Sequence, residues 1–317
     1  MTATAFLFPG QGAQRPGMGR DLTADRPDLR ERYYRAADDL LGFPLSAACF
    51  EGTDELLRRT EITQPAIFLT SVVTLDLIAE TLPAPAIVAG HSLGEYAALV
   101  CAGALEWTDA LHLVARRGAL MAAVNKRRPG RMAALFGTTP AAVEQLCAAT
   151  PGVVEIANDN SIDQLVISGE ADAVETVAAA ARAGGAERVV MLEVGAPFHC
   201  SLMHDIEQEF AARLDRVTIR DPKIPVIANA TGSYVTDAEG VATALRAQLA
   251  GRVRWTDTMR LLAVSGVQQA VEVGPGRVLA GLARATNPGL TVHSTNDTRR
   301  LRQTLAALSP SGQALVA

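Results

Sequence analysis

The segment that most constrains the fold is residues 86–94, where a short apolar run (AIVA) leads through Gly-His-Ser-Leu-Gly into a helix-like stretch that ends near Cys101. Glycines on both sides of the serine allow a sharp strand-to-helix turn and leave room for a strained residue between them. In this setting Gly-x-Ser-x-Gly is typical of a turn that lifts a serine hydroxyl, here that of Ser92, above a sheet and beside the amides of a helix N-terminus. The alternative is a glycine-rich turn with a structural role only.

Short apolar runs alternate with helical periodicity over much of the chain. Three further runs have the character of buried strands: residues 5–8, 224–228 and 270–273. Helical periodicity is clearest at residues 28–41, 64–81 and 109–123. Aromatic residues are only 4% of the chain, which favours helices packed on buried strands. The expected fold class is α/β, with a largely parallel sheet covered by helices on both faces.

A second pattern begins near Val124. Residues 124–131 are basic and contain Pro-Gly, which predicts a hinge. The order from residue 132 to about 192 is then strand, helix, strand, strand, helix, strand, which is the ferredoxin-like arrangement. We therefore predict a main catalytic domain of residues 1–126 and 198–317, with an inserted ferredoxin-like subdomain of residues 127–197.

Charge and cysteine usage exclude several classes of protein. The net charge of −5 makes the chain a poor electrostatic match for nucleic acid. The N-terminus has no basic segment of a signal peptide, and no run approaches the ~20 apolar residues of a membrane span. We expect a cytoplasmic protein. Four widely spaced cysteines without metal-ligand spacing are expected to be reduced thiols: Cys49, Cys101, Cys147 and Cys200.

A nucleophilic serine needs a base, and the chain has five histidines. His91 is expected to point away from Ser92 and to pack beneath the turn. His199 follows a predicted strand at the subdomain boundary, where a loop histidine could face a cleft, although the residues alone leave its role open. Structural or surface roles are expected for the other three: His112, His204 and His293.

The chain resembles the malonyl-CoA:acyl carrier protein transacylases, including the free-standing acyltransferases of polyketide synthesis. The resemblance runs from residue 8 to about residue 285. Its motifs stand in the family's order and spacing: FPGQGAQ (8–14), TQP (63–65), GHSLGE (90–95), RG (117–118) with Met121, NDN (158–160), QLVISG (164–169), PFH (197–199) and GPG (274–276).

This resemblance implies an α/β-hydrolase-like large domain and a ferredoxin-like small domain, with the site in the cleft between them. It assigns the nucleophile to Ser92 and the general base and acid to His199. The oxyanion would be held by the amides of Gln11 and Leu93. A backbone carbonyl from near Arg254 would orient the histidine.

The resemblance also assigns the malonyl carboxylate to Arg117, whose planar fork can meet a carboxylate with two hydrogen bonds. In the family, a bulky residue at the position of Phe198 goes with a preference for malonyl over branched malonyl units. The alternative is that Phe198 only packs between the two domains. Further substrate contacts are predicted for three residues: Gln64, Met121 and Asn160.

Two sites depart from the family pattern, one of them a pair of residues. Ile162 and Asp163 stand where Pro-Gly is common, and they predict an altered turn near the cleft. Arg131 replaces a small residue; it is read as either a substrate contact or a solvated loop residue, with the second favoured. Both departures leave the identity of the acyl group open.

The expected partners are malonyl-CoA and, transiently, an acyl carrier protein. Basic side chains could dock the acidic carrier, or they could be ordinary solvated surface: Lys126, Arg127, Arg128, Arg299 and Arg300. We expect a monomer without metal or permanently bound cofactor.

Three other functions remain open at this point. A hydrolase that clears stalled carrier proteins would use the same Ser92 and His199, but it would gain nothing from a carboxylate clamp. A transacylase for an unusual acyl unit would use the full set. An inactive docking module would not need it.

Overall fold

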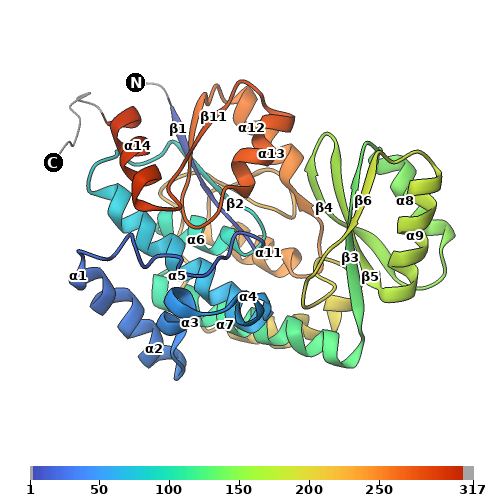
Figure 1. The fold of residues 1–317 in the computed structure, drawn as a ribbon, viewed down its shortest axis with the longest axis horizontal. Coiled ribbons are helices and arrows are strands. Elements are labelled where there is room, and N and C mark those ends of the chain that lie inside the picture. Colours follow the sequence, from blue (N-terminus) through green and yellow to red (C-terminus); the bar gives the residue numbers. More distant parts are fainter. Residues whose placement is uncertain (1–2, 310–317) are drawn as a thin grey trace.

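A computed structural model describes residues 3–309, whose strands form two separate sheets (Figure 1). The larger sheet has the order β11-β10-β1-β2-β7-β8. All its neighbours are parallel except β7 and β8. Its strands are β1 (Thr4–Phe8), β2 (Ile87–Gly90), β7 (Val226–Ile227), β8 (Tyr234–Val235), β10 (Gln269–Glu272) and β11 (Thr291–Ser294). The predicted runs at 5–8, 86–89, 224–228 and 270–273 all contain strands.

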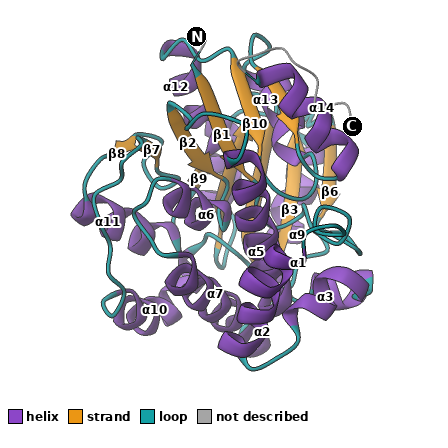
Figure 2. Ribbon diagram, turned by 90° about the vertical axis from the view of Figure 1, so that its left-hand side faces the viewer, coloured by secondary structure: helices purple, strands orange, loops and turns teal. Residues whose placement is uncertain are grey.

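Helices cover both faces of this sheet, as the alternation of strands and helices predicts. In β1, Phe6 and Phe8 belong to the apolar core on one face, whereas Ala5 and Leu7 belong to the core on the other. Helices α5 (Thr60–Ala79), α6 (Gly94–Cys101), α7 (Trp107–Arg127) and α14 (Thr298–Leu308) contribute to the first core (Figure 2). Helices α12 (Trp255–Val264) and α13 (Val278–Thr286) contribute to the second.

The remaining elements of this part are short. Residues 28–41, predicted as one helix, are divided into α1 (Pro27–Leu29), a π-helical segment (Arg30–Arg35) and α2 (Ala36–Leu41). The others are α3 (Leu45–Glu51), α4 (Asp54–Arg58), a 3-10 helix (Ser201–Ile206), α10 (Glu207–Leu214) and α11 (Ala238–Gln248).

Helix α5 is more apolar than the sequence reading allowed. By length and composition it could cross a membrane, which contradicts the expectation that no run approaches that limit. However, 78% of its most apolar 18-residue window is buried inside the fold, and α5 packs against α7. It has the character of a core helix.

The smaller sheet has the order β6-β3-β5-β4-β9. Its strands are β3 (Gly130–Phe136), β4 (Val154–Ser161), β5 (Gln164–Glu170), β6 (Arg188–Met191) and β9 (Val253–Arg254), and its helices are α8 (Pro140–Ala149) and α9 (Ala171–Ala183). The first four strands and two helices follow the ferredoxin-like order, so the predicted fold class is confirmed. The domain boundaries stay a prediction, since β9 comes from outside residues 127–197 and pairs with β4.

The hinge predicted at residues 124–131 is wrong. Helix α7 continues through Arg127 and β3 starts at Gly130, so only two residues join them. Basic side chains favour the negative end of a helix, and the residue before a proline leaves the helical conformation, as Arg128 does here. The basic run therefore ends the helix, and Pro129 stops it.

Candidate active site

The serine turn, residues 90–94, connects β2 to α6 as predicted. A Cβ atom on Gly90 would overlap the backbone of Gly94, and one on Gly94 would overlap the carbonyl of Phe8. Both glycines are therefore required by close backbone contacts. Between them Ser92 has φ of 51°. Strain of this kind persists where the surrounding structure fixes it, and it is concentrated at functional sites.

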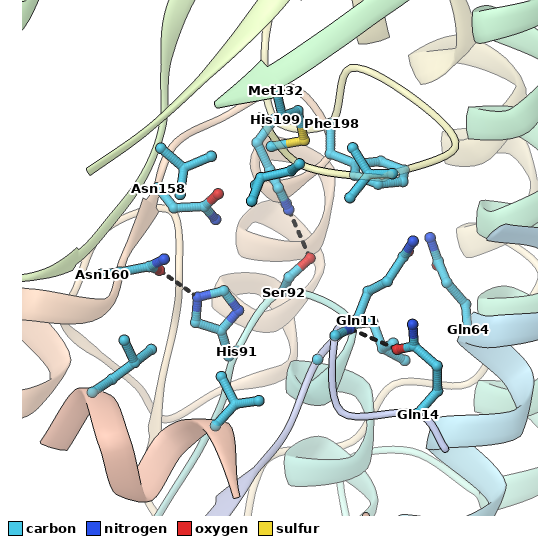
Figure 3. A pocket seen from close by; sticks show the side chains of 18 of the residues that line it. Gln11, Gln14, Gln64, His91, Ser92, Met132, Asn158, Asn160, Phe198 and His199 are labelled. Atoms are coloured by element: carbon cyan, nitrogen blue, oxygen red, sulfur yellow. Dashed lines mark hydrogen bonds between the residues drawn. The ribbon is translucent and has the colours of Figure 1, made fainter. Parts of the chain in front are cut away.

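The hydroxyl of Ser92 faces the imidazole of His199 (Figure 3). The distance from Ser92 Oγ to His199 Nε2 is 2.6 Å. His199 also has positive φ, 57°, and these two are the only non-glycine residues with positive φ within residues 3–309. The structure thus holds both members of the pair in strained backbone conformations and within hydrogen-bond distance.

Two backbone carbonyls orient the imidazole. His199 Nδ1 donates to the oxygens of Gln248 (3.0 Å) and Gly251 (3.1 Å). The resemblance placed this carbonyl near Arg254, but the acceptors lie earlier in the chain, at Gln248 and Gly251. Gln248 is the last residue of α11, and the final carbonyls of a helix have no partner within it.

His199 is neutral at ordinary pH. Burial, with the positive charge of Arg117, lowers the pKa of His199 to about 3. Because carbonyls only accept, Nδ1 carries the proton, and the lone pair of Nε2 is free to accept the proton of Ser92. The geometry suits a general base.

Arg117, on α7, lies in the same cluster. The residue is 1% exposed, and its Nη2 lies 3.1 Å from Ser92 Oγ. Nη1 donates to Gln64 Oε1 at 2.8 Å, and Nη2 also reaches Gln248 Oε1 at 3.2 Å. Nε has no hydrogen-bond partner, and no carboxylate forms an ion pair with this arginine among residues 3–309. Its neighbour Arg116 is half-exposed and pairs with Glu209.

These side chains border a cavity of about 340 Å³, here called the cleft cavity. Its walls come from the loop after β1, the serine turn, the first turns of α13 and the cleft side of β3, β4 and β5. Helices α8 and α9 lie on the other side of the smaller sheet (Figure 1). The site therefore lies between the two sheets, as the resemblance implied.

Two backbone amides are available beside Ser92. Gln11 and Leu93 both line the cleft cavity, and within the described part of the chain neither amide N–H has a hydrogen-bond partner. Free amides next to a nucleophile can stabilise a developing oxyanion. Their role as the oxyanion hole stays a prediction.

Three of the four other predicted substrate residues line the cleft cavity, and one does not. Gln64, Asn160 and Phe198 line the cleft cavity. Met121 does not; it is buried behind Gln64, whose Nε2 lies 3.5 Å from Met121 Sδ.

His91 points away from Ser92, as expected (Figure 3). However, it does not only pack beneath the turn. It lines the cleft cavity, with Nε2 2.7 Å from Asn160 Oδ1. Asn160 in turn donates to Gln164 Oε1 at 3.0 Å. This wall is therefore polar and internally hydrogen-bonded. The other histidines lie elsewhere: His112 and His204 are exposed, and His293 contacts Gln269.

The departures from the family pattern lie outside the cavity lining. Ile162 is 65% exposed at the two-residue turn between β4 and β5. Arg131 pairs with Glu175 of α9, at 3.0 Å, on the helix-covered side of the smaller sheet. Arg131 is exposed, as the favoured interpretation expected, but it lies in strand β3 and not in a loop.

The candidate docking residues form two separate groups. Lys126, Arg127 and Arg128 are at the C-terminal end of α7 beside β3, whereas Arg299 and Arg300 are on α14, which packs against β11 of the larger sheet (Figure 1). Arg128 lies 3.5 Å from Glu170 and 3.9 Å from Asp205. No single small surface contains all five residues.

Sequence reasoning missed three buried residues that hold the serine turn. Asn229 Oδ1 accepts from the Ser92 amide at 2.5 Å, and Gln248 Nε2 donates to the Ser92 carbonyl at 2.9 Å. Glu95 bonds to both of them. Glu95 offered a signal, since it is an acid on an apolar helix directly after the motif, whereas Gln248 and Asn229 lie more than 130 residues away in the chain.

Comparison with known proteins connects this geometry to a family. Residues 5–297 match the acyl transferase domain family. The chain is 39% identical to the malonyl CoA-acyl carrier protein transacylase of Escherichia coli over 300 residues, which cover 94% of this chain and 97% of that protein. The corresponding protein of Bacillus subtilis is 37% identical over 311 residues, covering 97% and 98%. Among solved structures, a malonyl-transacylase in complex with a type II PKS acyl carrier protein superposes with a TM-score of 0.91 at 37% identity, covering 97% and 99%.

Proposed function

The chain belongs to the malonyl-CoA:acyl carrier protein transacylase family, and from this membership we propose that it transfers a malonyl group from coenzyme A to the phosphopantetheine thiol of an acyl carrier protein. Fatty acid and polyketide synthesis both use this step, and one structural neighbour is a malonyl-transacylase bound to a type II PKS acyl carrier protein. The domain division at 127–197, a cytoplasmic location, a monomeric state and the lack of a resident cofactor are part of the same proposal.

The single observation that carries the choice of acyl group is the burial of Arg117 with no carboxylate in ion-pair contact among residues 3–309. An unpaired buried charge costs several kcal/mol. The guanidinium nevertheless lies 3.1 Å from the Ser92 hydroxyl. A substrate that brings its own carboxylate to within a few ångströms of the reacting carbonyl would supply the missing partner, and a malonyl thioester is such a substrate.

The first half-reaction forms an ester on Ser92. Oγ attacks the thioester carbonyl while its proton moves to Nε2 of His199. The amides of Gln11 and Leu93 hold the oxyanion. The carbon–sulfur bond then breaks, and Nε2 returns the proton to the departing coenzyme A thiolate.

The second half-reaction reverses these roles. The carrier's thiol gives its proton to His199, and its sulfur attacks the ester carbonyl. The carbon–oxygen bond breaks and Ser92 Oγ regains a proton from Nε2. The bound carboxylate also offsets the charge of Arg117, which is one cause of the low pKa of His199. Malonyl binding thereby makes the imidazole a stronger base when it is needed.

The mouth of the cleft cavity offers a cation for the thioester arm. Apart from Arg117, Arg58 is the only arginine or lysine lining the cavity in the described residues. Its side chain is 57% exposed and lies 3.6 Å from Glu193. We assign Arg58 to the phosphate at the end of the pantetheine arm, which coenzyme A and the loaded carrier protein share.

A hydrolase is the competing function, and one experiment separates the two. The protein is incubated with malonyl-CoA and, separately, acetyl-CoA, and its intact mass is followed over time. We expect a malonyl adduct that forms much faster than the acetyl adduct and passes to a holo carrier protein. The Ser92→Ala variant should form no adduct. Equal acetylation and malonylation would contradict the role of Arg117. Rapid release of free malonate in the presence of the carrier would favour the hydrolase.

A further inference from the structure

Glu95 is a buried acid next to the site that the reaction steps above do not use. It stands on α6, three residues after Ser92, and is 1% exposed. No lysine or arginine forms an ion pair with it within residues 3–309, and it does not line the cleft cavity. A carboxyl group is costly to bury, so its place calls for a specific role.

The two hydrogen bonds of this carboxyl group end on one oxygen. Glu95 Oε2 accepts from Gln248 Nε2 at 2.7 Å and from the backbone N–H of Asn229 at 3.1 Å. Both donors also hold the serine turn. The side chain of Asn229 bridges the turn from the Gly90 carbonyl (2.6 Å) to the Ser92 amide, and Gln248 binds the Ser92 carbonyl.

Gln248 forms hydrogen bonds with all three main residues of the site. Its amide nitrogen faces Ser92, its amide oxygen faces Arg117, and its backbone carbonyl binds His199. A side-chain amide can be turned by half a rotation, which exchanges its donor and acceptor. Turned, it would present N–H groups to the Arg117 donor and an oxygen to the Ser92 carbonyl, so both contacts would be lost.

We propose that Glu95 is a positioning residue that locks the Gln248 amide in the orientation needed by Arg117 and Ser92. With Glu95 in place, the amide nitrogen has two acceptors, and the turned state would set oxygen against both. The consequence is a guanidinium fixed relative to the nucleophile, and hence a preference for carboxylated acyl groups. The inference rests on the transacylase function proposed above.

The geometry makes a distinction between two substitutions. Because a single oxygen accepts both bonds, the amide oxygen of a glutamine can replace it, and Glu95→Gln should retain the function. Glu95→Leu has a similar size but no acceptor. Gln248→Leu removes the side-chain amide and keeps the backbone carbonyl that binds His199.

The test measures single-turnover acylation of Ser92 by malonyl-CoA and by acetyl-CoA, using intact mass, for E95Q, E95L, Q248L and the double variant E95L/Q248L. We expect E95Q to malonylate within about threefold of the wild-type rate and E95L to be slower by about 30-fold, in line with loss of a buried polar contact. The malonyl-to-acetyl preference of E95L should fall. The double variant should be no slower than Q248L alone, because Glu95 acts through Gln248.

Glu272 provides a matched control, since it is a second fully buried glutamate whose oxygens accept from the amides of Leu279 (3.0 Å) and Ala280 (2.9 Å). E272L should keep the malonyl-to-acetyl preference of the wild type. An equal fall in E272L, an unchanged rate in E95L, or multiplied effects in the double variant would overturn the proposal. If E95L does not fold, Q248L carries the test: unchanged preference there would overturn it. Wild-type protein that takes up no malonyl group would instead refute the transacylase function itself.

Discussion

The guanidinium of Arg117 and the hydroxyl of Ser92 lie 3.1 Å apart, although one residue is in the middle of α7 and the other in the turn after β2. The same hydroxyl is 2.6 Å from His199. A fixed positive charge, a nucleophile and a neutral base therefore share one buried point.

Replacing Arg117 should remove the preference for malonyl-CoA over acetyl-CoA. Arg117→Ala is expected to lower kcat/KM for malonyl-CoA by about 100-fold, the loss typical of truncating one partner of a buried charge pair. Acetyl-CoA has no carboxylate, so its rate should change little. Arg116→Ala is the control, because that neighbour points to Glu209 at the surface. Equal losses with both thioesters would contradict the assignment.

The acid side of the pH profile should be unusually flat. The pKa of His199 is lowered to about 3, so the imidazole stays an unprotonated base well below neutral pH. A histidine at its ordinary pKa of about 6.5 would lose about 30-fold in reactive form by pH 5. We expect kcat/KM for malonylation to change little between pH 7 and pH 5. Imidazole NMR should show the pKa of His199 rising in Arg117→Gln, and an unchanged value would argue against the influence of the guanidinium.

Glu95 should leave a signature in the pH dependence of stability. Burial raises its pKa from 4.5 to about 7, against the hydrogen bonds from Gln248 and Asn229 and the charge of Arg117, which lower it. The folded state thus holds a proton that the unfolded chain releases above pH 4.5. The contribution of Glu95 to the free energy of unfolding is therefore greatest below pH 4.5 and is lost as the pH rises through about 7. The loss is about 3 kcal/mol at most.

Urea unfolding at pH 5 and pH 8 tests this linkage. The wild type should lose more unfolding free energy over this interval than Glu95→Gln, which carries no titrating group at that position. Taking the difference between the two proteins cancels the opposite contribution of His199. Identical changes in both would show that Glu95 titrates normally.

Arg58 should matter for substrates that carry the pantetheine phosphate. Arg58→Ala is expected to raise KM about tenfold for both malonyl-CoA and the holo carrier protein, the cost of one charge-assisted contact. Transfer from a malonyl thioester without the phosphate should be unaffected. Arg59→Ala is the matched control, since that side chain pairs with Glu61 at 2.9 Å and does not line the cavity. An equal effect on the phosphate-free thioester would exclude a phosphate contact.

The reach of sequence reasoning differed between the fold and the site. The strands, the long helices and the ferredoxin-like order were predictable, because apolar periodicity records which face of an element is buried. The hinge at residues 124–131 was predicted wrongly, since basic residues and Pro-Gly are found both at the end of a helix and in a hinge. The division of residues 28–41 into three helical segments had no signal in the periodicity.

What the sequence alone determined is local. The serine turn follows from glycines whose neighbours leave no room for a Cβ atom, and that requirement is written within residues 90–94. Tertiary structure decided which distant groups meet there: Ser92 and His199 are 107 positions apart, and Ser92 and Gln248 are 156. The carbonyls that orient His199, the cavity-facing position of His91 and the separation of the two basic groups were settled in the same way. The physical reason is that backbone sterics act between adjacent residues, whereas the partners of a side chain depend on how whole elements pack.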